Sequence, residues 1–347
     1  MEQYVHSLLC EARLRKSEIG GEHVSTLYFG GGTPSVMPLN LMSRLVEGLD
    51  NVFDLSHVEE FTIEVNPDDV TAGYITALRS MGANRVSMGV QSFNDNELRA
   101  INRRHSAQQA KDAVLTIKNA GIDNISIDII YGLPGQSLDS WQHNVEQAIN
   151  LDVQHISAYC LSYEKGTRLW VMREQGRVKE VSDELCVDMY NLLVKRLKEA
   201  GFEHYEISNF ALPGYRSRHN SSYWNFTPYL GLGAAAHSYD GTARRYNPSS
   251  IKEYNKKLSN SIPAFLEESL DERERYDEEI MLRLRTSNGL DTDTIKQHYG
   301  TEAYKALLLK AKPYIEQGLL RKEQNTLILT PDGVMLSDNI ISNLMWD

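Results

Sequence analysis

The sequence predicts an α/β protein built on a parallel sheet, followed by a smaller unit of mixed helices and strands. Short apolar strands and amphipathic helices alternate through the first 165 residues, with connections of only a few residues. Such alternation is typical of right-handed βαβ units. At 347 residues the chain exceeds the usual size of a single core, so we expect one large domain with a small appendix.

The predicted elements follow one another in a regular order. The expected strands are residues 27–29, 61–65, 85–90, 125–130 and 154–159. The expected helices are residues 2–16, 40–49, 72–81, 107–120 and 138–150. Further along, we expect a helix over 182–200, a strand over 205–210 and a loop that holds residues 219–224.

The C-terminal part has a different pattern. Helices over 271–285 and 302–317, with a hairpin over 319–329, predict a winged-helix-like unit. Winged helices often bind DNA, so a regulator is one candidate function. Residues 271–347 carry 14 acidic and 10 basic side chains, whereas a DNA-reading surface normally has the opposite balance. We therefore favour a structural or lid role and expect no nucleic-acid partner.

Composition and charge narrow the class of protein. The net charge is −11 and no long basic run occurs. The sequence has no apolar run long enough to span a bilayer and does not begin with a signal peptide. These two features predict a cytoplasmic protein without an integral membrane segment. Peripheral contact with a membrane stays open. Cys10, Cys160 and Cys186 lie far apart in sequence, so they predict neither a disulfide framework nor a clustered metal motif. Each is expected to be an inert thiol.

A run of three glycines follows the first expected strand, in Gly30-Gly31-Gly32-Thr33-Pro34. Consecutive glycines at a strand end indicate a special dihedral or the close approach of a ligand. A P-loop needs a lysine before its Ser or Thr, and a dinucleotide fingerprint needs a third glycine inside the helix; neither is present. What remains is a backbone edge that can hydrogen-bond an amino-acid moiety.

Polar residues lie at or near the carboxyl ends of the later strands. These are Glu64, Gln91, Asp128 and Tyr159. Active sites of parallel barrels and open α/β sheets form at that edge. A carboxylate between apolar neighbours, such as Asp128 between Ile127 and Ile129, is costly to bury unless it is paired or hydrogen-bonded.

Together these motifs resemble radical S-adenosylmethionine proteins, specifically the oxygen-independent coproporphyrinogen III oxidase family. The resemblance rests on residues 30–34, Glu64 with Asn66-Pro67, residues 89–93, Arg103 and residues 128–134, and it spans nearly the whole chain. It implies a partial (β/α)6 barrel of the TIM type that lacks its first strand here, and an α+β winged-helix-like C-terminal domain. The implied domains are a barrel over 1–165, a barrel extension over 166–270 and the C-terminal domain over 271–347.

The resemblance also implies binding residues for S-adenosylmethionine. Gly31, Gly32 and Thr33 would hold its methionine moiety, and Glu64 its amino group. Gln91 and Asp128 would bind the ribose hydroxyls, Arg103 the carboxylate, and Ile130 and Tyr159 the adenine region. The residue types suit these groups, since an amine favours a carboxylate and vicinal hydroxyls favour acceptors.

The segment from His219 to Trp224 resembles the HNxxYW motif of the heme chaperone (HemW) branch of that family. The resemblance implies heme binding by His219, Asn220, Tyr223 and Trp224, because histidine is a common axial ligand and aromatic rings offer a flat apolar surface. His237 is a weaker ligand candidate. The implied function is heme binding and transfer to heme-accepting proteins. Coproporphyrinogen III oxidation is the alternative, and the electron donor and oligomeric state stay open.

One departure from the family concerns its iron-sulfur cluster. Members place three cysteines, as C-x3-C-x2-C, in a loop after the first strand, and their thiolates hold a 4Fe-4S cluster. No such motif occurs in this sequence. We expect either that Met1 is an internal methionine of a longer, N-terminally truncated protein or that the chain lacks the cluster. The chain as given is then expected not to cleave S-adenosylmethionine, and whether the protein is an enzyme stays open.

Overall fold

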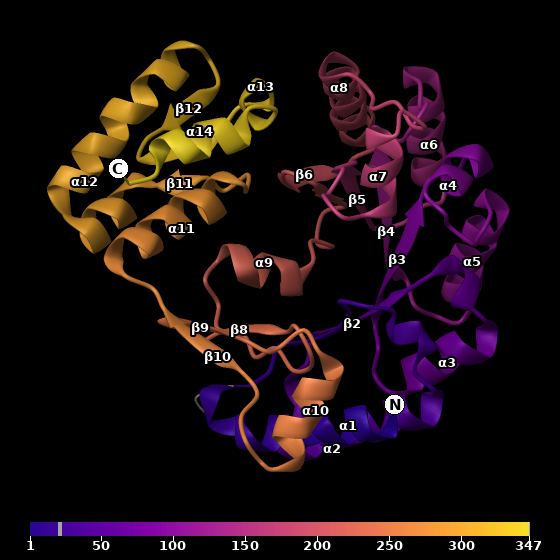
Figure 1. The fold of residues 1–347 in the computed structure, drawn as a ribbon. Coiled ribbons are helices and arrows are strands. Elements are labelled where there is room, and N and C mark those ends of the chain that lie inside the picture. Colours follow the sequence, from indigo (N-terminus) through magenta and orange to yellow (C-terminus); the bar gives the residue numbers. More distant parts are fainter. Residues whose placement is uncertain (20–22, 347) are drawn as a thin grey trace.

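A parallel sheet forms the centre of the computed structural model, which describes residues 1–19 and 23–346 (Figure 1). The parallel strands lie side by side in chain order: β1 (Thr26–Phe29), β2 (Glu60–Val65), β3 (Arg85–Gln91), β4 (Asn124–Tyr131) and β5 (His155–Cys160). Two antiparallel strands, β7 (Asn209–Ala211) and β6 (Glu203–Glu206), extend the sheet beyond β5. The predicted α/β class is therefore confirmed.

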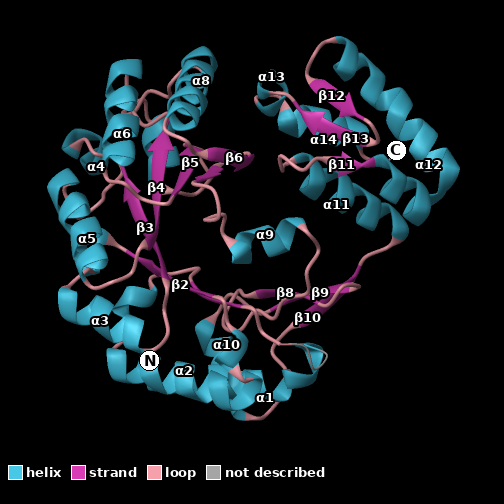
Figure 2. Ribbon diagram, turned by 180° about the vertical axis from the view of Figure 1, so that it is seen from behind, coloured by secondary structure: helices cyan, strands magenta, loops and turns pink. Residues whose placement is uncertain are grey.

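Helices cover one face of the sheet, and its other face is turned toward α9 (Arg218–Trp224) and the C-terminal unit (Figure 2). The covering helices are α2 (Leu39–Phe53), α3 (Ala72–Ser80), α5 (Ala107–Asn119), α6 (Leu138–Asn150) and α8 (Asp183–Glu199). Two shorter helices, α4 (Asp95–Ala100) and α7 (Arg168–Glu174), follow β3 and β5 and contribute no residue to the core under the covering helices. Side chains alternate along a strand, so Ile125, Ile127 and Ile129 belong to the apolar core under the helices. Ser126 and Asp128 consequently face the other side.

The N-terminal helix α1 (Glu2–Leu14) packs against α2 and α10 (Ile251–Ser259). Its apolar face, which includes Val5 and Leu9, shares a core with Leu45 of α2 and Tyr254 of α10. Since α10 lies in the last third of the chain, this core joins residues that are about 250 positions apart. The helix predicted at the start of the sequence is thus present, with its apolar stripe buried.

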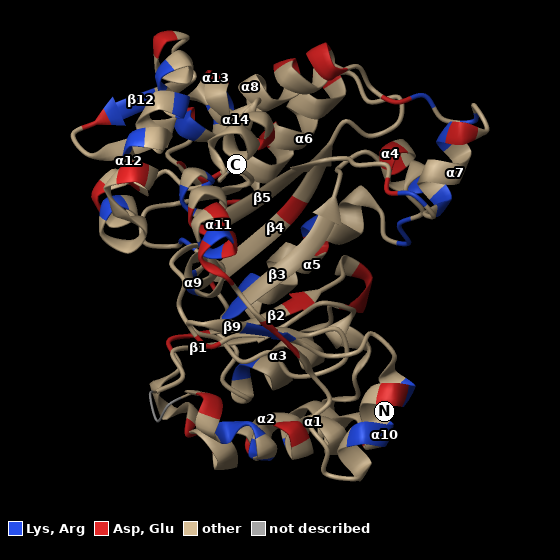
Figure 3. Ribbon diagram, turned by 60° about the vertical axis from the view of Figure 1, so that its left-hand side comes forward, with Lys and Arg blue, Asp and Glu red and all other residues tan. Residues whose placement is uncertain are grey.

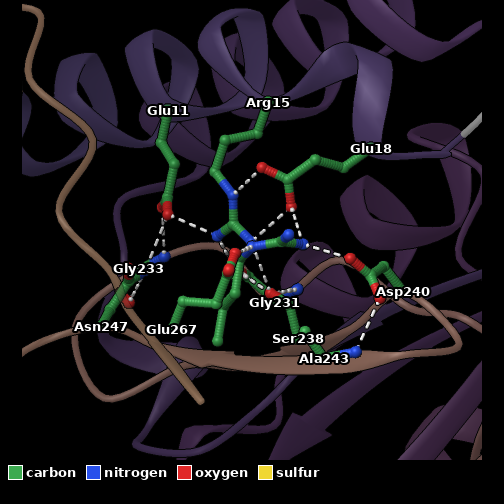
Figure 4. Close-up of polar contacts among 11 residues, drawn as sticks. Glu11, Arg15, Glu18, Gly231, Gly233, Ser238, Asp240, Ala243, Asn247 and Glu267 are labelled. Atoms are coloured by element: carbon green, nitrogen blue, oxygen red, sulfur yellow. Dashed lines mark hydrogen bonds and ion pairs between the residues drawn. The ribbon is translucent and has the colours of Figure 1, made fainter. Parts of the chain in front are cut away.

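Buried polar residues of α1 reinforce that contact (Figure 4). The fully buried Glu11 accepts hydrogen bonds from four donors: the Arg15 side chain at 2.9 Å, Gly233 N at 2.9 Å, Asn247 Nδ2 at 2.8 Å and the Tyr254 hydroxyl at 2.7 Å. Arg15 also pairs with Glu18 at 2.8 Å. Paired and hydrogen-bonded in this way, the two charges tolerate burial.

The segment between the sheet and the C-terminal unit differs from the sequence-based expectation in three places. The single strand predicted over 205–210 is wrong, because β6 and β7 form a hairpin whose turn is held by Ser208 N donating to the Glu206 carboxylate at 3.2 Å. The loop predicted around His219 is wrong as well, because α9 is a helix capped by the Ser217 hydroxyl. A small antiparallel sheet of β8 (His237–Tyr239), β9 (Ala243–Tyr246) and β10 (Leu266–Ser269) was not predicted.

The C-terminal unit has its own apolar core, formed by four helices and a three-stranded sheet. Its elements are α11 (Glu272–Leu284), β11 (Leu290–Asp291), α12 (Thr292–Glu316), β12 (Leu320–Glu323), β13 (Thr326–Leu329), α13 (Pro331–Val334) and α14 (Ser337–Leu344). α12 is kinked at Gly300, whose φ of 86° lies in the left-handed region. The unit contacts the barrel through backbone hydrogen bonds from Ile207 N to Arg285 O and from Ser287 N to Tyr205 O.

Candidate functional site

The uncovered face of the sheet is polar. Glu60, Thr62 and Glu64 alternate with the core residues of β2, and Arg85 and Ser87 do so on β3. Acidic residues stand out on β2 and β4 (Figure 3), and Arg85 adds a basic residue on β3. These polar side chains point away from the apolar core under the helices, so they are not needed for the packing of the helices on the sheet. This face of the sheet is therefore the candidate functional surface.

The glycine run lies against Glu64, as the sequence suggested. Glu64 accepts hydrogen bonds from the Tyr28 hydroxyl at 2.6 Å and from Gly31 N at 3.2 Å. A Cβ at Gly30 would lie 2.4 Å from the Tyr28 ring and 2.5 Å from the Glu64 carboxylate, and Gly31 has a φ of 76°. Both glycines are therefore required by the geometry. Gly32 and Thr33 continue this loop into the short 3-10 turn Pro34–Val36.

A second group of predicted residues lies at the ends of β3 and β4. Gln91, Arg103 and Ile130 line one cavity of about 560 Å3. Arg103 donates to Gly89 O at 2.6 Å and to Asn66 Oδ1 at 3.0 Å, while its buried Nε has no partner within the protein. Gln91 adopts a φ of 69°, a strained value for a residue with a side chain, at a bulge of β3. The free donor and the strain both point to a ligand-binding position.

Asp128 and Tyr159 complete this edge of the sheet. Burial raises the pKa of Asp128 to about 6, although a hydrogen bond from Ser157 opposes the shift. Tyr159 is 43% exposed, and its pKa is raised to about 12 by desolvation and then by Asp128. An exposed aromatic ring beside a half-buried carboxylate offers one apolar and one hydrogen-bonding surface to a nucleoside. The roles of these residues stay predictions.

Helix α9 carries the heme motif and is fixed to the sheet by one buried carboxylate. Glu60, 4% exposed, accepts hydrogen bonds from Arg218 N at 2.9 Å, His219 N at 3.0 Å and the Ser217 hydroxyl at 3.3 Å. These are the free N–H groups of the first helical turn, which a negative charge stabilises. Glu60 thereby sets where His219 lies relative to β1.

His219 is held on both sides of its ring. Its Nδ1 lies 3.0 Å from Thr26 Oγ1, its Nε2 lies 2.8 Å from the Tyr223 hydroxyl, and its ring stacks on Tyr28 with centroids 4.6 Å apart. Burial lowers the pKa of His219 to about 4; Glu60 opposes this shift and Arg85 adds to it. The imidazole is therefore neutral at physiological pH, which is the form that binds metal ions.

The other motif residues spread away from His219. Tyr223 is 37% exposed and meets Tyr229 edge-on at 4.7 Å. Trp224 lies under the Arg285 guanidinium, 5.9 Å from it, and its buried Nε1 has no partner. Asn220 takes part through its backbone N–H, which donates to the Ser217 hydroxyl. His237 is not gathered with this group, because its ring stacks on Tyr246 of β9.

Several residues of this surface were missed by sequence reasoning. Thr26, Tyr28 and Glu60 surround His219 and Glu64, and Arg85 is a buried cation of the same face. Alternation of polar residues on β2 and β3 was the available signal, because it marks side chains that avoid the apolar core. It does not tell which of them contact a distant helix.

The cysteines do not form a cluster site in the described part of the chain. Cys10 lies on α1 and contacts Leu258 O, whereas Cys160 and Cys186 both lie near Gly132. Across residues 1–19 and 23–346, no three His, Cys, Asp or Glu side chains are grouped as metal ligands. These residues therefore do not fit a 4Fe-4S cluster. Over the same residues, every helix is too short or too polar to cross a membrane.

Comparisons with known proteins place the chain in a family. It matches the radical SAM superfamily over residues 2–148 and the HemN C-terminal domain over residues 270–336. It is 33% identical over 347 residues to the heme chaperone HemW of Lactococcus lactis subsp. lactis, covering 100% of this chain and 90% of that protein. For heme chaperone HemW of Bacillus subtilis the identity is 31%, with 100% and 92% covered.

A solved structure supports the same fold. Coproporphyrinogen III oxidase (HemN) from Escherichia coli, a radical SAM enzyme, superposes with a TM-score of 0.84 over 99% of this chain and 82% of its own, at 24% identity. At that identity the likeness concerns the fold, and it agrees with the predicted partial barrel and C-terminal domain. The chain belongs to the radical SAM superfamily, in the family of HemW and HemN proteins.

Proposed function

We propose that this protein binds heme through His219 and passes it to acceptor proteins. The observation that carries the proposal is the state of His219, a neutral imidazole beside a hydroxyl on each ring nitrogen. If Nδ1 carries the hydrogen and donates to Thr26 Oγ1, Nε2 holds a lone pair that accepts from the Tyr223 hydroxyl. An iron ion would take that lone pair in place of the hydroxyl, and Thr26 would keep the ring in the right tautomer.

S-adenosylmethionine fits the opposite end of the polar face. Glu64 offers a carboxylate to its ammonium group, and Arg103 has a buried free donor for its carboxylate. Asp128 and Gln91 offer acceptors to ribose hydroxyls. When bound, the cofactor supplies an adenosyl group and a sulfonium. The residues named above would bind and orient it, and Gly30, which has no Cβ, lets Glu64 and Tyr28 lie close to the backbone of the glycine run.

Heme titration followed at the Soret band tests the proposal. We expect a red-shifted Soret band for the wild-type chain and a loss of most of that shift in His219→Ala. His237→Ala is the matched control, because it removes a histidine of β8 whose ring stacks on Tyr246 of β9. An identical spectrum for wild type and His219→Ala would contradict iron binding by this residue. Turnover of coproporphyrinogen III by a full-length version of the protein would instead favour the oxidase alternative.

A further inference from the structure

Arg85, the first residue of β3, carries a buried positive charge that has no counter-ion in the protein. Its side chain is 2% exposed and lies on the polar face of the sheet, opposite the core residue Val86. Its Nη1 donates to Thr62 Oγ1 across 3.5 Å, the long limit of a hydrogen bond, and its buried Nε has no partner. Among residues 1–19 and 23–346, no carboxylate forms an ion pair with this guanidinium.

Arg15, which is buried to the same extent, shows what such a charge needs. It is also 2% exposed, but it pairs with Glu11 at 2.9 Å and with Glu18 at 2.8 Å. A buried guanidinium without a negative partner destabilises the folded chain, so a binding partner for it is expected. Glu60 of the same polar face is not that partner, because both of its oxygens already accept hydrogen bonds from the start of α9.

A second buried polar atom without a partner belongs to the neighbouring strand. Asn124 of β4 is the register partner of Arg85 of β3, and its side chain lies on the same face, because the next residue, Ile125, belongs to the apolar core. The buried Oδ1 of Asn124 accepts no hydrogen bond from the described residues. Buried polar groups nearly always have a partner. A donor and an acceptor left open on adjacent strands therefore indicate a ligand that both accepts and donates hydrogen bonds.

We propose that Arg85 and Asn124 bind a small carboxylate-type anion, such as bicarbonate, inside the partial barrel. Because Nη1 is directed at Thr62, Nε and Nη2 form the free edge of the Arg85 guanidinium. That edge presents two parallel N–H groups, which match the two oxygens of a carboxylate. The O–H group of bicarbonate donates to Asn124 Oδ1. The ligand is small because Arg85 is almost completely buried.

This anion site lies within the polar face but does not depend on heme binding. Arg85 opposes the rise in the pKa of Asp128 that burial causes, and it adds to the lowering of the pKa of His219. Its positive charge therefore acts at both ends of the polar face, and a bound anion neutralises it there. The tests below measure anion binding and stability in the absence of heme, so their outcome is separate from that of the proposed function.

Calorimetric titration of bicarbonate into the heme-free chain, in buffer freed of carbon dioxide, tests the site. We expect saturable binding by the wild type and no measurable binding by Arg85→Met. Arg85→Lys keeps the charge but loses the two-pronged edge, so its affinity should be about tenfold weaker. Arg104→Met is the control and should bind like the wild type, because Arg104 is 71% exposed and pairs with Asp68. Chloride at the same ionic strength should give no saturable heat.

Thermal unfolding supplies a second measurement. Without bicarbonate, the unfolding midpoint of Arg85→Met should equal or exceed that of the wild type, because the variant removes a buried charge that has no partner. Arg15→Met should lower the midpoint, because it leaves Glu11 buried without its cation. Saturating bicarbonate should raise the wild-type midpoint by about 2–4 °C and leave that of Arg85→Met unchanged. Equal responses of the wild type to bicarbonate and chloride, or a wild-type response to bicarbonate in Arg85→Met, would overturn the inference.

Discussion

Replacing Glu60 with Gln tests how the sheet positions the heme motif. The carboxylate accepts hydrogen bonds from three donors at the start of α9: Ser217 Oγ, Arg218 N and His219 N. Gln keeps one accepting oxygen and puts an NH2 group where the second oxygen was. That group faces the Arg218 N–H, so two donors then point at each other in a site that is 4% exposed for the native residue.

The size of the effect follows from these contacts. One charge-assisted hydrogen bond contributes about 1.5–3 kcal/mol, and a buried unsatisfied donor adds a cost of about 1–3 kcal/mol. The loss of negative charge at a helix N-terminus adds about 0.3–1 kcal/mol. Since the NH2 group relaxes part of the clash by moving, we expect Glu60→Gln to lower the free energy of unfolding by about 2–4 kcal/mol.

The neighbouring Glu59 provides a matched control. It contacts the same residue, Arg218, but as a surface ion pair whose side chains are 62% and 57% exposed. Such pairs contribute about 0–1 kcal/mol, so Glu59→Gln should be nearly neutral. Urea unfolding followed by circular dichroism gives both values, and heme titration should show weaker binding only in Glu60→Gln. Equal stability and equal heme affinity in the two variants would refute the role of Glu60.

Three further predictions concern the rest of the polar face. Tyr28→Phe removes the 2.6 Å hydrogen bond to Glu64 but keeps the ring that stacks on His219. Calorimetric titration should therefore show the affinity for S-adenosylmethionine falling about three- to tenfold in this variant, with Tyr246→Phe as the control. Unchanged affinity in Tyr28→Phe would speak against Glu64 as the ammonium acceptor. Burial raises the pKa of Glu206 to about 7 from 4.5, so the folded chain holds a proton that the unfolded chain releases, and stability falls as pH rises between these values. Glu206→Gln should remove this fall and be more stable than wild type by up to about 3 kcal/mol above pH 7, as measured by unfolding across that range; a difference that does not vary with pH would contradict the sign. Reconstitution of this chain with iron and sulfide should yield no 4Fe-4S absorbance and no 5′-deoxyadenosine. The reason is that Cys10 lies far in sequence from Cys160 and Cys186 and on a different element. Appreciable cluster formation would show that this arrangement of the three cysteines is wrong.

The parallel strands, and the polar residues at the edge where these strands end, could be predicted because local sequence determines both. Apolar strands such as 125–129 need no distant partner to be recognised, and Glu64, Gln91 and Asp128 follow from their position near strand ends. The glycine run was informative for the same reason, since a Cβ at Gly30 would strike the neighbouring Tyr28 and Glu64.

The elements that were missed depend on contacts distant in sequence. α9 contains His, Asn and two serines, which favour helix only weakly, and its first turn is satisfied by Glu60, a residue more than 150 positions away. The turn between β6 and β7 contains no glycine or proline and is closed by the side chain of Glu206. The domain boundaries inferred from the sequence stay predictions.

The central claim is that heme iron takes the place of the Tyr223 hydroxyl on His219 Nε2. Heme affinity of Tyr223→Phe and His219→Ala, measured side by side, tests it most directly. Tyr223→Phe keeps the aromatic ring but removes the hydroxyl that lies 2.8 Å from Nε2. It should therefore bind heme more tightly than wild type, by about three- to tenfold, since the competing hydrogen bond is gone. His219→Ala should bind it more weakly. Reduced affinity in Tyr223→Phe together with wild-type affinity in His219→Ala would contradict the claim.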